Sequence, residues 1–210
     1  MRNKPLAAPR RSMSPARFTT YALAGWSGCF VMAPELLGGR ALAPYFGTGV
    51  YVWGALIALF MLSLSIGYLL GGSFSTHRPS LARLAAIVLA ATVATLPCVL
   101  AMDPILNAVF DSVPDPRYGA LTAAVALFFL PIAISGVVSP YAIRLLVDAL
   151  GTSGKVAGRV FFVSTLGSTI GTLGTSFWLI LWWELNHILY WMLAISFALS
   201  LATLAGSRAR

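Results

Sequence analysis

Charged and metal-binding side chains are scarce in this chain of 210 residues. Only 10% of the residues are charged, six are acidic, two are histidines and two are cysteines. Cys29 and Cys98 lie in strongly apolar segments, without the spacing of metal ligands and without a partner cysteine in a loop. This pattern excludes a disulfide framework, and we interpret both cysteines as packing residues. The sequence predicts no metal site.

Catalytic and cofactor-binding motifs are missing as well. The sequence lacks a strand, glycine-rich loop and helix followed by an acidic residue, which would be needed to hold a dinucleotide or an S-adenosyl group. His77 and His187 fall on opposite sides of the predicted membrane, and no nucleophile has a base beside it. No stretch between the apolar segments is long enough to form a soluble core. We therefore expect no cofactor, no catalytic residue, and no enzymatic activity of the isolated chain.

Hydrophobic residues, in contrast, make up 59% of the chain, and the mean hydropathy is +0.85. The apolar stretches run for about 20 residues, the length that a membrane-spanning helix needs. They also lack the period-two alternation of a transmembrane β-strand. Since the hydrocarbon offers no water to backbone groups, helices are expected. The sequence predicts an all-α, polytopic membrane protein with six transmembrane helices, at about residues 18–41, 50–72, 81–102, 118–138, 156–183 and 185–206.

The basic residues predict how these helices are oriented. A net charge of +8 would suggest nucleic acid in a soluble protein, but here the basic residues flank apolar segments, so no nucleic-acid partner is expected. With a cytoplasmic N-terminus, Arg40 and Arg117 alone fall outside. Twelve fall inside: Arg2, Lys4, Arg10, Arg11, Arg17, Arg78, Arg83, Arg144, Lys155, Arg159, Arg208 and Arg210. The expected parts are a basic cytoplasmic tail at 1–17, a six-helix domain in membrane lipid at 18–206, and a cytoplasmic end at 207–210.

Two charged residues interrupt the first apolar segment and mark the candidate site. A charge at the centre of a membrane helix costs about 2.5–3.5 kcal/mol, so Glu35 and Arg40 should be paired, face a cavity or lie at the interface. On an ideal helix a spacing of five places them about 140° apart, so direct pairing would require the helix to bend or unwind at Gly38 and Gly39. Partners on other helices are therefore expected, and the polar candidates for this network or for a ligand are Tyr45, Tyr68, Tyr141, Arg144 and Arg159.

Glycines recur at a spacing of four in two segments. Gly67 and Gly71 lie in the second predicted helix, and Gly167 and Gly171, followed by Gly174, lie in the fifth. Small residues at this spacing let two helices approach closely, so we interpret the five glycines as helix-packing positions. A glycine-lined substrate passage or a dimer face is the alternative.

Two further segments allow two interpretations each. Residues 103–117 form either a short helix on the outer interface or an ordinary loop punctuated by prolines. The fourth helix contains Pro131 and should kink or break near 136–140, where it could line a binding site. The favoured interpretation is instead a short surface helix over 141–150 that starts after Pro140, with Arg144 and Asp148 on one face.

Several sequence blocks resemble the membrane domain of a bacterial protein family described as fused major-facilitator/spermidine-synthase-like. The blocks are 35–47 (ELLGGRALAPYFG), 51–53 (YVW), 67–72 (GYLLGG), 139–145 (SPYAIRL) and 158–172 (GRVFFVSTLGSTIGT). The resemblance implies one half of a major-facilitator fold in the bacterial inner membrane, usually followed by a cytoplasmic aminopropyltransferase-like domain. This chain stops at Arg210, where that domain would attach. It also departs from the family at Ser73 and at 76–78 (THR), where an arginine and an Asp-Arg pair are usual.

Three functions are consistent with these observations. The first is a non-catalytic membrane subunit or anchor that works with a separate protein, either a soluble synthase-like enzyme or a larger membrane complex. The second is a half-size permease for polyamines or similar small molecules, which acts as a dimer and in which Glu35 meets a cationic substrate. The third is a structural subunit of a larger energy-converting membrane complex.

Overall fold

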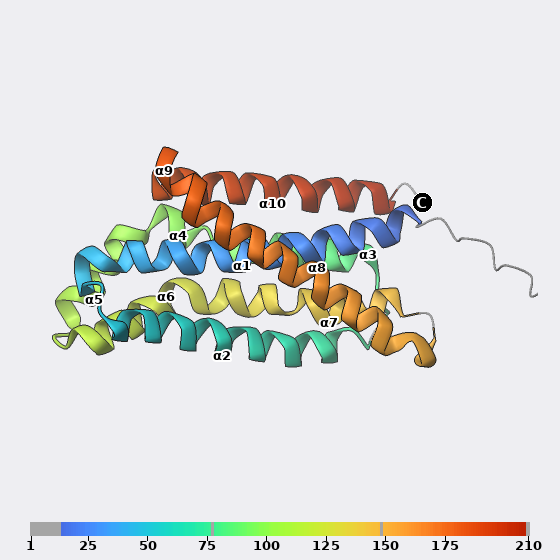
Figure 1. The fold of residues 1–210 in the computed structure, drawn as a ribbon, viewed down its shortest axis with the longest axis horizontal. Helices are drawn as coiled ribbons and strands as arrows, with labels where there is room; N and C mark the ends of the chain where they lie inside the picture. The colour runs from blue at the N-terminus through green and yellow to red at the C-terminus, as the bar shows by residue number, and fades with distance from the viewer. Residues whose placement is uncertain (1–13, 77, 148, 209–210) are drawn as a thin grey trace, which may run out of the picture.

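The structure is a computed structural model that describes residues 14–76, 78–147 and 149–208 (Figure 1). These residues form helices joined by short turns, with no strand among them. The predicted all-α fold is therefore confirmed. Most of the predicted basic tail (residues 1–13), His77, Asp148 and residues 209–210 lie outside the described residues.

The long helical segments run back and forth along one axis of the bundle. Consecutive segments alternate in direction, so the described chain begins and ends at the same end of the bundle (Figure 1). The segments are α1 (Pro15–Phe46), α2 (Val50–Phe74), α3 (Leu81–Ala94) with α4 (Pro97–Leu100), α6 (Pro116–Gly136) with α7 (Val138–Leu146), α8 (Ser153–Gly174) with α9 (Ile180–Trp182), and α10 (Leu185–Arg208). A π-helix at Thr175–Leu179 joins α8 to α9, a 3₁₀ turn at Leu150–Thr152 precedes α8, and α5 (Met102–Ser112) lies at the far end.

Five of these stretches are long and apolar enough to cross a membrane: Val50–Phe74, Leu81–Leu100, Pro116–Leu146, Ser153–Trp182 and Leu185–Ser207. The chain is thus a multi-pass membrane protein by the length and composition of its helices. The predicted helices agree with these five within a few residues at most ends. A sixth span, in α1, stays a prediction because α1 is less apolar than the others.

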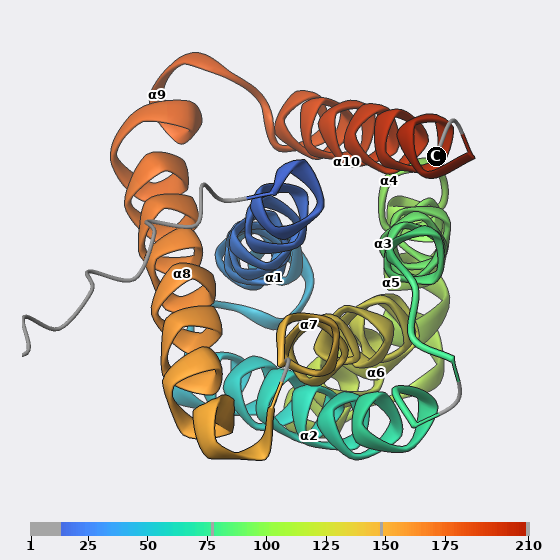
Figure 2. The same ribbon diagram turned by 90° about the vertical axis from the view of Figure 1, so that its right-hand side faces the viewer.

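The position of α1 explains its composition. In the end-on view α1 lies inside the ring formed by the other helices (Figure 2), and it contacts α2, α3, α6, α7, α8 and α10. Protein rather than lipid therefore surrounds much of α1, and small or polar residues such as Ser27 and Gly28 are buried in it. Helices at the periphery are less buried by protein. Only 17% of the apolar window of Ser153–Trp182 is buried, against 61% for Pro116–Leu146.

Local sequence signals explain where several helices begin. Ser80 precedes α3, and its hydroxyl accepts a hydrogen bond from the backbone N–H of Arg83 at 3.2 Å. Asp115 caps α6 in the same way through the N–H of Arg117 at 2.9 Å, and Pro116 follows as the first helical residue. Of the two interpretations of residues 103–117, the helical one holds for α5, whose Leu106 is buried in the core.

The favoured interpretation of residues 141–150 as a surface helix is wrong. The helix, α7, begins at Val138 rather than after Pro140 and ends at Leu146. Tyr141, Ala142 and Leu146 are at most 1% exposed, so α7 lies in the core. It continues the line of α6 after an interruption at Val137, and the two together form one apolar stretch. Proline at the third position of α7 is tolerated because a first helical turn has no intrahelical partners for its N–H groups.

The helix contacts follow a repeated pattern. The most extensive contacts join α1 to α8, α2 to α6, and α3 to α10. Counted along the chain, α1, α2 and α3 are the first three long segments, and α6, α8 and α10 are the last three. If each of the first three is exchanged with its counterpart in the last three, the α1–α8 pair becomes the α6–α2 pair. The α3–α10 pair is unchanged by this exchange. The sequence carries a trace of this exchange, because α2 reads Ile66-Gly67 and α8 reads Leu166-Gly167, each followed by a second glycine four residues later.

Candidate functional site

The two ends of the bundle differ in charge. Seven described basic residues lie at the end of the bundle where the described chain begins and ends, which we call the basic end: Arg17, Arg78, Arg83, Arg144, Lys155, Arg159 and Arg208. They lie in or beside the α2–α3 and α7–α8 connections, on the first turns of α1 and α3, on the first two turns of α8 and at the end of α10, all at one end of the bundle (Figure 1). The opposite end carries Asp103, Asp111, Asp115 and Glu184. Arg40 and Arg117 are the basic residues of the described chain on that half. The charge asymmetry predicted from the sequence thus corresponds to two physical ends of the bundle.

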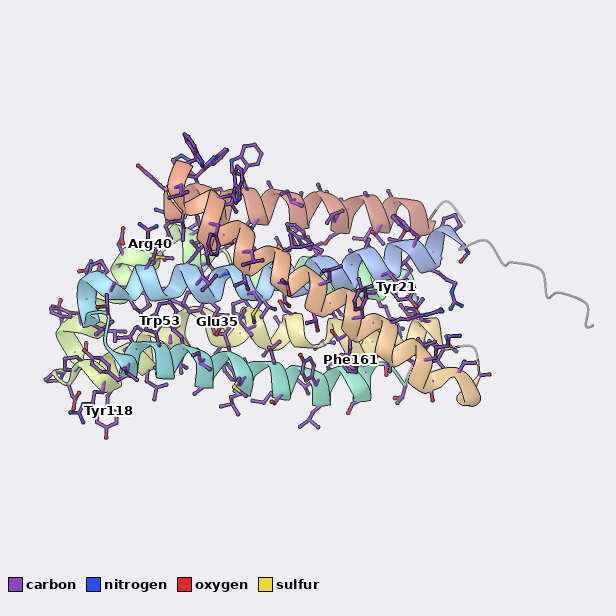
Figure 3. The ribbon with its side chains drawn as sticks, in the orientation of Figure 1. Tyr21, Glu35, Arg40, Trp53, Tyr118 and Phe161 are labelled. Atoms are coloured by element: carbon purple, nitrogen blue, oxygen red, sulfur yellow. The ribbon has the colours of Figure 1, made fainter. Side chains whose placement is uncertain are left out.

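Glu35 and Arg40 both lie on α1 but do not meet. α1 is helical throughout Pro15–Phe46, including Gly38 and Gly39, so it does not unwind to bring the two side chains together. Within the described part of the chain, neither side chain forms an ion pair or a hydrogen bond. Arg40 is exposed near the end opposite the basic end, whereas Glu35 is half-buried nearer the middle of the bundle (Figure 3). Glu35 is therefore a half-buried carboxyl group without a partner among the described residues.

Glu35 lies on the face of α1 between its contacts with α2 and α8, and we call the stretch of this face that neither helix covers the opening between α2 and α8. Gly28, Met32, Glu35 and Gly39 follow each other at spacings of four, three and four, so they share one face of α1. At one end of this face a Cβ on Gly28 would overlap the backbone of Ser164 in α8. At the other end, a Cβ on Gly39 would lie 2.6 Å from the Trp53 ring of α2. α2 and α8 do not pack extensively against each other, so Glu35 occupies the line along α1 that they leave uncovered.

A small polar cavity of about 50 Å³ lies at the basic-end side of Glu35 on the same face. Its lining includes the side chains of five serines and one tyrosine, from α1, α2, α6, α7 and α8: Ser27, Ser135, Ser139, Ser164, Ser168 and Tyr68. The Ser27 hydroxyl donates to the carbonyl oxygen of Ser135 at 3.3 Å, which ties α1 to α6. Glu35 lies seven residues after Gly28, about 10.5 Å along the axis. The opening therefore combines one carboxyl group with a cluster of hydroxyls.

The structure separates the other predicted polar candidates. Tyr68 lines the serine cavity, whereas Tyr45 packs on Phe110 at the opposite end, with ring centroids 6.2 Å apart. Tyr141 is buried, and its hydroxyl accepts a hydrogen bond from the N–H of Ser80 at 3.1 Å. Arg144 and Arg159 are exposed at the basic end. Only Glu35 and Tyr68 of the predicted network therefore belong to the opening between α2 and α8.

The predicted helix-packing glycines fall into two groups. A Cβ on Gly67 would overlap the carbonyl oxygen of Ala133 in α6, and one on Gly71 would lie 2.5 Å from the Pro140 ring. In α8, a Cβ on Gly167 would overlap the carbonyl oxygen of Gly25, and one on Gly171 would lie 2.8 Å from the carbonyl oxygen of Cys29. Gly174 differs, since a Cβ there would meet no atom within 4 Å. Close helix packing therefore does not account for Gly174, which corrects its assignment.

Sequence reasoning missed the serine cluster and one role of Cys98. Serines are common in membrane helices, so their convergence from four helices becomes visible only in three dimensions. For Cys98 a signal did exist. Pro131 has no N–H, which leaves the Leu127 carbonyl without its helical donor, and the Cys98 thiol donates to that oxygen at 2.9 Å. Both cysteines are free thiols.

No group of three or more potential metal-ligating side chains occurs among the described residues. Searches against family models, curated proteins and solved structures found no match to this chain. The resemblance to the spermidine-synthase-like membrane domain therefore stays a prediction from the sequence blocks.

Proposed function

We propose that this chain is a non-catalytic integral membrane subunit that works with a partner protein, and that the partner covers the opening between α2 and α8. The proposal includes six spans, a bacterial inner-membrane location and cytoplasmic termini. The observation that carries it is Glu35, a half-buried carboxyl group with no partner in the described chain, which the proposed sixth span would place within the membrane. Ionisable residues in membrane helices are rare and mark functional or binding sites. A partner that brings a cation or a hydrogen-bond donor would satisfy Glu35.

Two features of the opening support a protein partner. α2 meets α1 near Glu35, where Trp53 and Leu56 lie against Gly39 and Gly38. Close to this level α2 carries the large apolar side chains of Ile57 and Met61, which are 46% and 65% exposed. The hydroxyls of the half-buried Ser164 and Ser168 form no hydrogen bond within the described residues, so they are available to a helix that packs there. The opening therefore offers both contact area and polar groups to another membrane helix.

Purification in mild detergent from the native membrane tests this proposal. The wild-type chain should retain a partner at near-equal stoichiometry, whereas Glu35→Gln should retain roughly fivefold less, the factor that corresponds to about 1 kcal/mol. Glu184→Gln is the matched control, because Glu184 is exposed at the end of α9. A wild-type chain recovered alone would contradict the proposal. The identity of the partner separates a soluble synthase-like enzyme from a larger membrane complex, including an energy-converting one.

A half-size permease acting as a dimer is the second candidate, favoured by the repeated contact pattern. Transporter halves are built from inverted three-helix repeats, with substrate sites near the midplane where the repeats meet. Here the exchange of the first and last three segments preserves the main helix pairs, and the serine cavity lies where α1, α2, α6, α7 and α8 meet. In a dimer with opposed openings, Glu35 would face a polyamine or another cationic substrate.

Uptake of spermidine into proteoliposomes that contain only this chain tests the permease. Wild-type uptake should exceed that of empty vesicles, and Glu35→Gln should lower it by about tenfold, which corresponds to the loss of roughly 1.4 kcal/mol of interaction with the cation. Glu184→Gln should transport like the wild type. Uptake by the wild type at the level of empty vesicles would contradict the permease and leave the subunit as the only candidate.

A further inference from the structure

A second, separate groove runs along α1 between α8 and α10. It consists of two adjoining cavities of about 820 and 390 Å³, which share Trp26, Cys29 and Ile170 as lining residues. α8 and α10 flank α1 without extensive contacts between them (Figure 2). The groove extends from Phe18 at the basic end to Trp183 at the other end, and its lining is almost entirely apolar. It does not include Glu35, so a ligand in this groove is independent of the proposed function.

Polar groups gather at the basic end of this groove. Val163 lies against Gly25, so Arg159 and Tyr21, each four residues earlier, lie at the same level and line the groove together (Figure 3 labels Tyr21). The Arg159 guanidinium is exposed and has no ion pair or hydrogen bond within the described residues. The Tyr21 hydroxyl and the Trp26 indole N–H are buried, and neither has a partner in the described chain. The basic end of this apolar groove thus carries a free cation and one unsatisfied hydroxyl, and the unsatisfied Trp26 N–H lies farther along, where the two cavities adjoin.

A comparable groove on the other side of the bundle shows what is distinctive here. That groove, of about 700 Å³, lies between α2 and α3 and also has an arginine and a tyrosine at the basic end, Arg83 and Tyr141. Both of these residues are already engaged. The Arg83 guanidinium donates to the carbonyl oxygen of Arg78 at 3.0 Å, and the Tyr141 hydroxyl accepts from the N–H of Ser80. Of the two grooves, the one between α8 and α10 therefore has the available cation.

We propose that the groove between α8 and α10 binds one anionic phospholipid, with its phosphate beside Arg159 and an acyl chain along α1. Basic pockets between membrane helices bind anionic headgroups on the cytoplasmic side, and a guanidinium forms strong charge-assisted hydrogen bonds to phosphate. Lys155 lies one turn before Arg159 and adds a second positive charge. From Tyr21 to Ala33 the groove follows α1 for about 18 Å, which matches the hydrocarbon depth of one leaflet, about 15 Å.

Native mass spectrometry of the detergent-purified chain tests the site, with phosphatidylglycerol and phosphatidylcholine of equal chain length as probes. The wild type should bind one phosphatidylglycerol at least fivefold more tightly than phosphatidylcholine. Arg159→Gln should abolish this preference, whereas Arg144→Gln should keep it, since Arg144 is exposed at the same end but does not line the groove. Ala22→Trp fills the groove from an exposed position, so it should weaken the binding of both lipids without disturbing the core.

Three outcomes would overturn the proposal. Equal binding of the two lipids by the wild type would mean that only ordinary annular lipid is present. An equal loss of preference in Arg144→Gln and Arg159→Gln would mean that the whole basic end, rather than this groove, attracts anionic lipid. If Ala22→Trp instead removed a second copy of the chain from the complex, the groove would be a protein interface.

Discussion

A proline in a membrane helix leaves a carbonyl group without its helical donor, and this chain shows how a single side chain compensates. Pro131 lies within α6 and is buried, so water cannot reach the Leu127 carbonyl that it frees. The Cys98 thiol, on the neighbouring α4, donates to that carbonyl. Cys98 thus acts as a hydrogen-bond donor as well as a packing residue.

Replacing Cys98 should therefore reveal a polar contribution. Cys98→Ala removes the donor and leaves a buried carbonyl unsatisfied, so the free energy of unfolding should fall by about 1–3 kcal/mol. Cys98→Ser keeps a donor and should lose less. Unfolding of the purified protein by increasing SDS in mixed micelles, followed by circular dichroism, measures the difference. Cys29→Ala is the control, because the Cys29 thiol forms no hydrogen bond within the described residues. Equal effects of the three substitutions would contradict this role.

Two tyrosines that the sequence grouped together should also differ. Tyr141→Phe keeps the buried ring but removes the acceptor of the Ser80 N–H, so it should lower the free energy of unfolding by about 0.5–1.5 kcal/mol. Tyr68 is 44% exposed, and its hydroxyl has no hydrogen-bond partner among the described residues. Tyr68→Phe should therefore leave stability unchanged in the same SDS titration. A larger loss for Tyr68→Phe than for Tyr141→Phe would contradict this assignment.

The sequence identified Glu35 because a charge inside an apolar run is visible without coordinates. It could not assign partners to Glu35, since the spacing of helices around α1 decides which side chains come near. Ser27, Ser135 and Ser164 lie far apart in the chain and line one cavity only because α1, α6 and α8 converge there. Residue identity was thus predictable, whereas the composition of the site depended on the tertiary arrangement.

The positions of whole helices could be predicted from the sequence where a long apolar run coincides with a helix. The stretches in α2 and α10 begin where the sequence predicted because apolar runs begin there. The prediction failed at α7, where Pro140 was interpreted as the start of a surface helix. Proline is equally compatible with the first turn of a buried helix, and the burial of Tyr141 decides between the two. Local signals therefore located helix ends but did not reveal which face a helix buries.

Contact between helices should depend on two glycines and not on a third. Alanine at Gly67 or Gly167 would place a methyl group against the backbone of the facing helix, so each substitution should lower the free energy of unfolding by about 1–3 kcal/mol or more. Gly174→Ala is the matched control within α8, because the added methyl group meets no atom within 4 Å. It should be neutral or gain up to about 1 kcal/mol from helix propensity.

The SDS titration used for Cys98 measures these glycine variants too, and the gap between Gly167→Ala and Gly174→Ala is the informative quantity. Both residues lie on the same helix and both substitutions are chemically identical, so helix propensity and detergent effects cancel in the comparison. A gap near zero would mean that α1 and α8 do not pack through Gly25 and Gly167.

At the scale of the whole molecule, the open question about topology is whether α1 spans the membrane. Its 32 residues could extend about 48 Å, more than the hydrocarbon thickness. Its polar and small residues argue against an isolated span, but α1 lies inside the ring of other helices, where protein contacts replace lipid (Figure 2). A helix so enclosed does not need the hydropathy of its neighbours. We therefore expect α1 to cross as a sixth span.

Labelling of single cysteines in intact cells with a membrane-impermeant maleimide decides the number of spans. In a background of Cys29→Ala and Cys98→Ser, exposed positions at both ends of the bundle are available: Asp111→Cys at the end of α5 opposite the basic end, and Thr152→Cys at the basic end. The excess of Lys and Arg at the basic end predicts that Asp111→Cys is labelled and that Thr152→Cys is labelled only after permeabilisation.

The decisive position is Ser14→Cys, just before α1. If α1 crosses, Ser14→Cys behaves like Thr152→Cys; if the chain has only five spans, it is labelled in intact cells like Asp111→Cys. Labelling of Ala205→Cys, near the end of α10, shows independently on which side of the membrane the C-terminal end lies. An inverted orientation of the whole bundle can therefore be distinguished from the absence of one span.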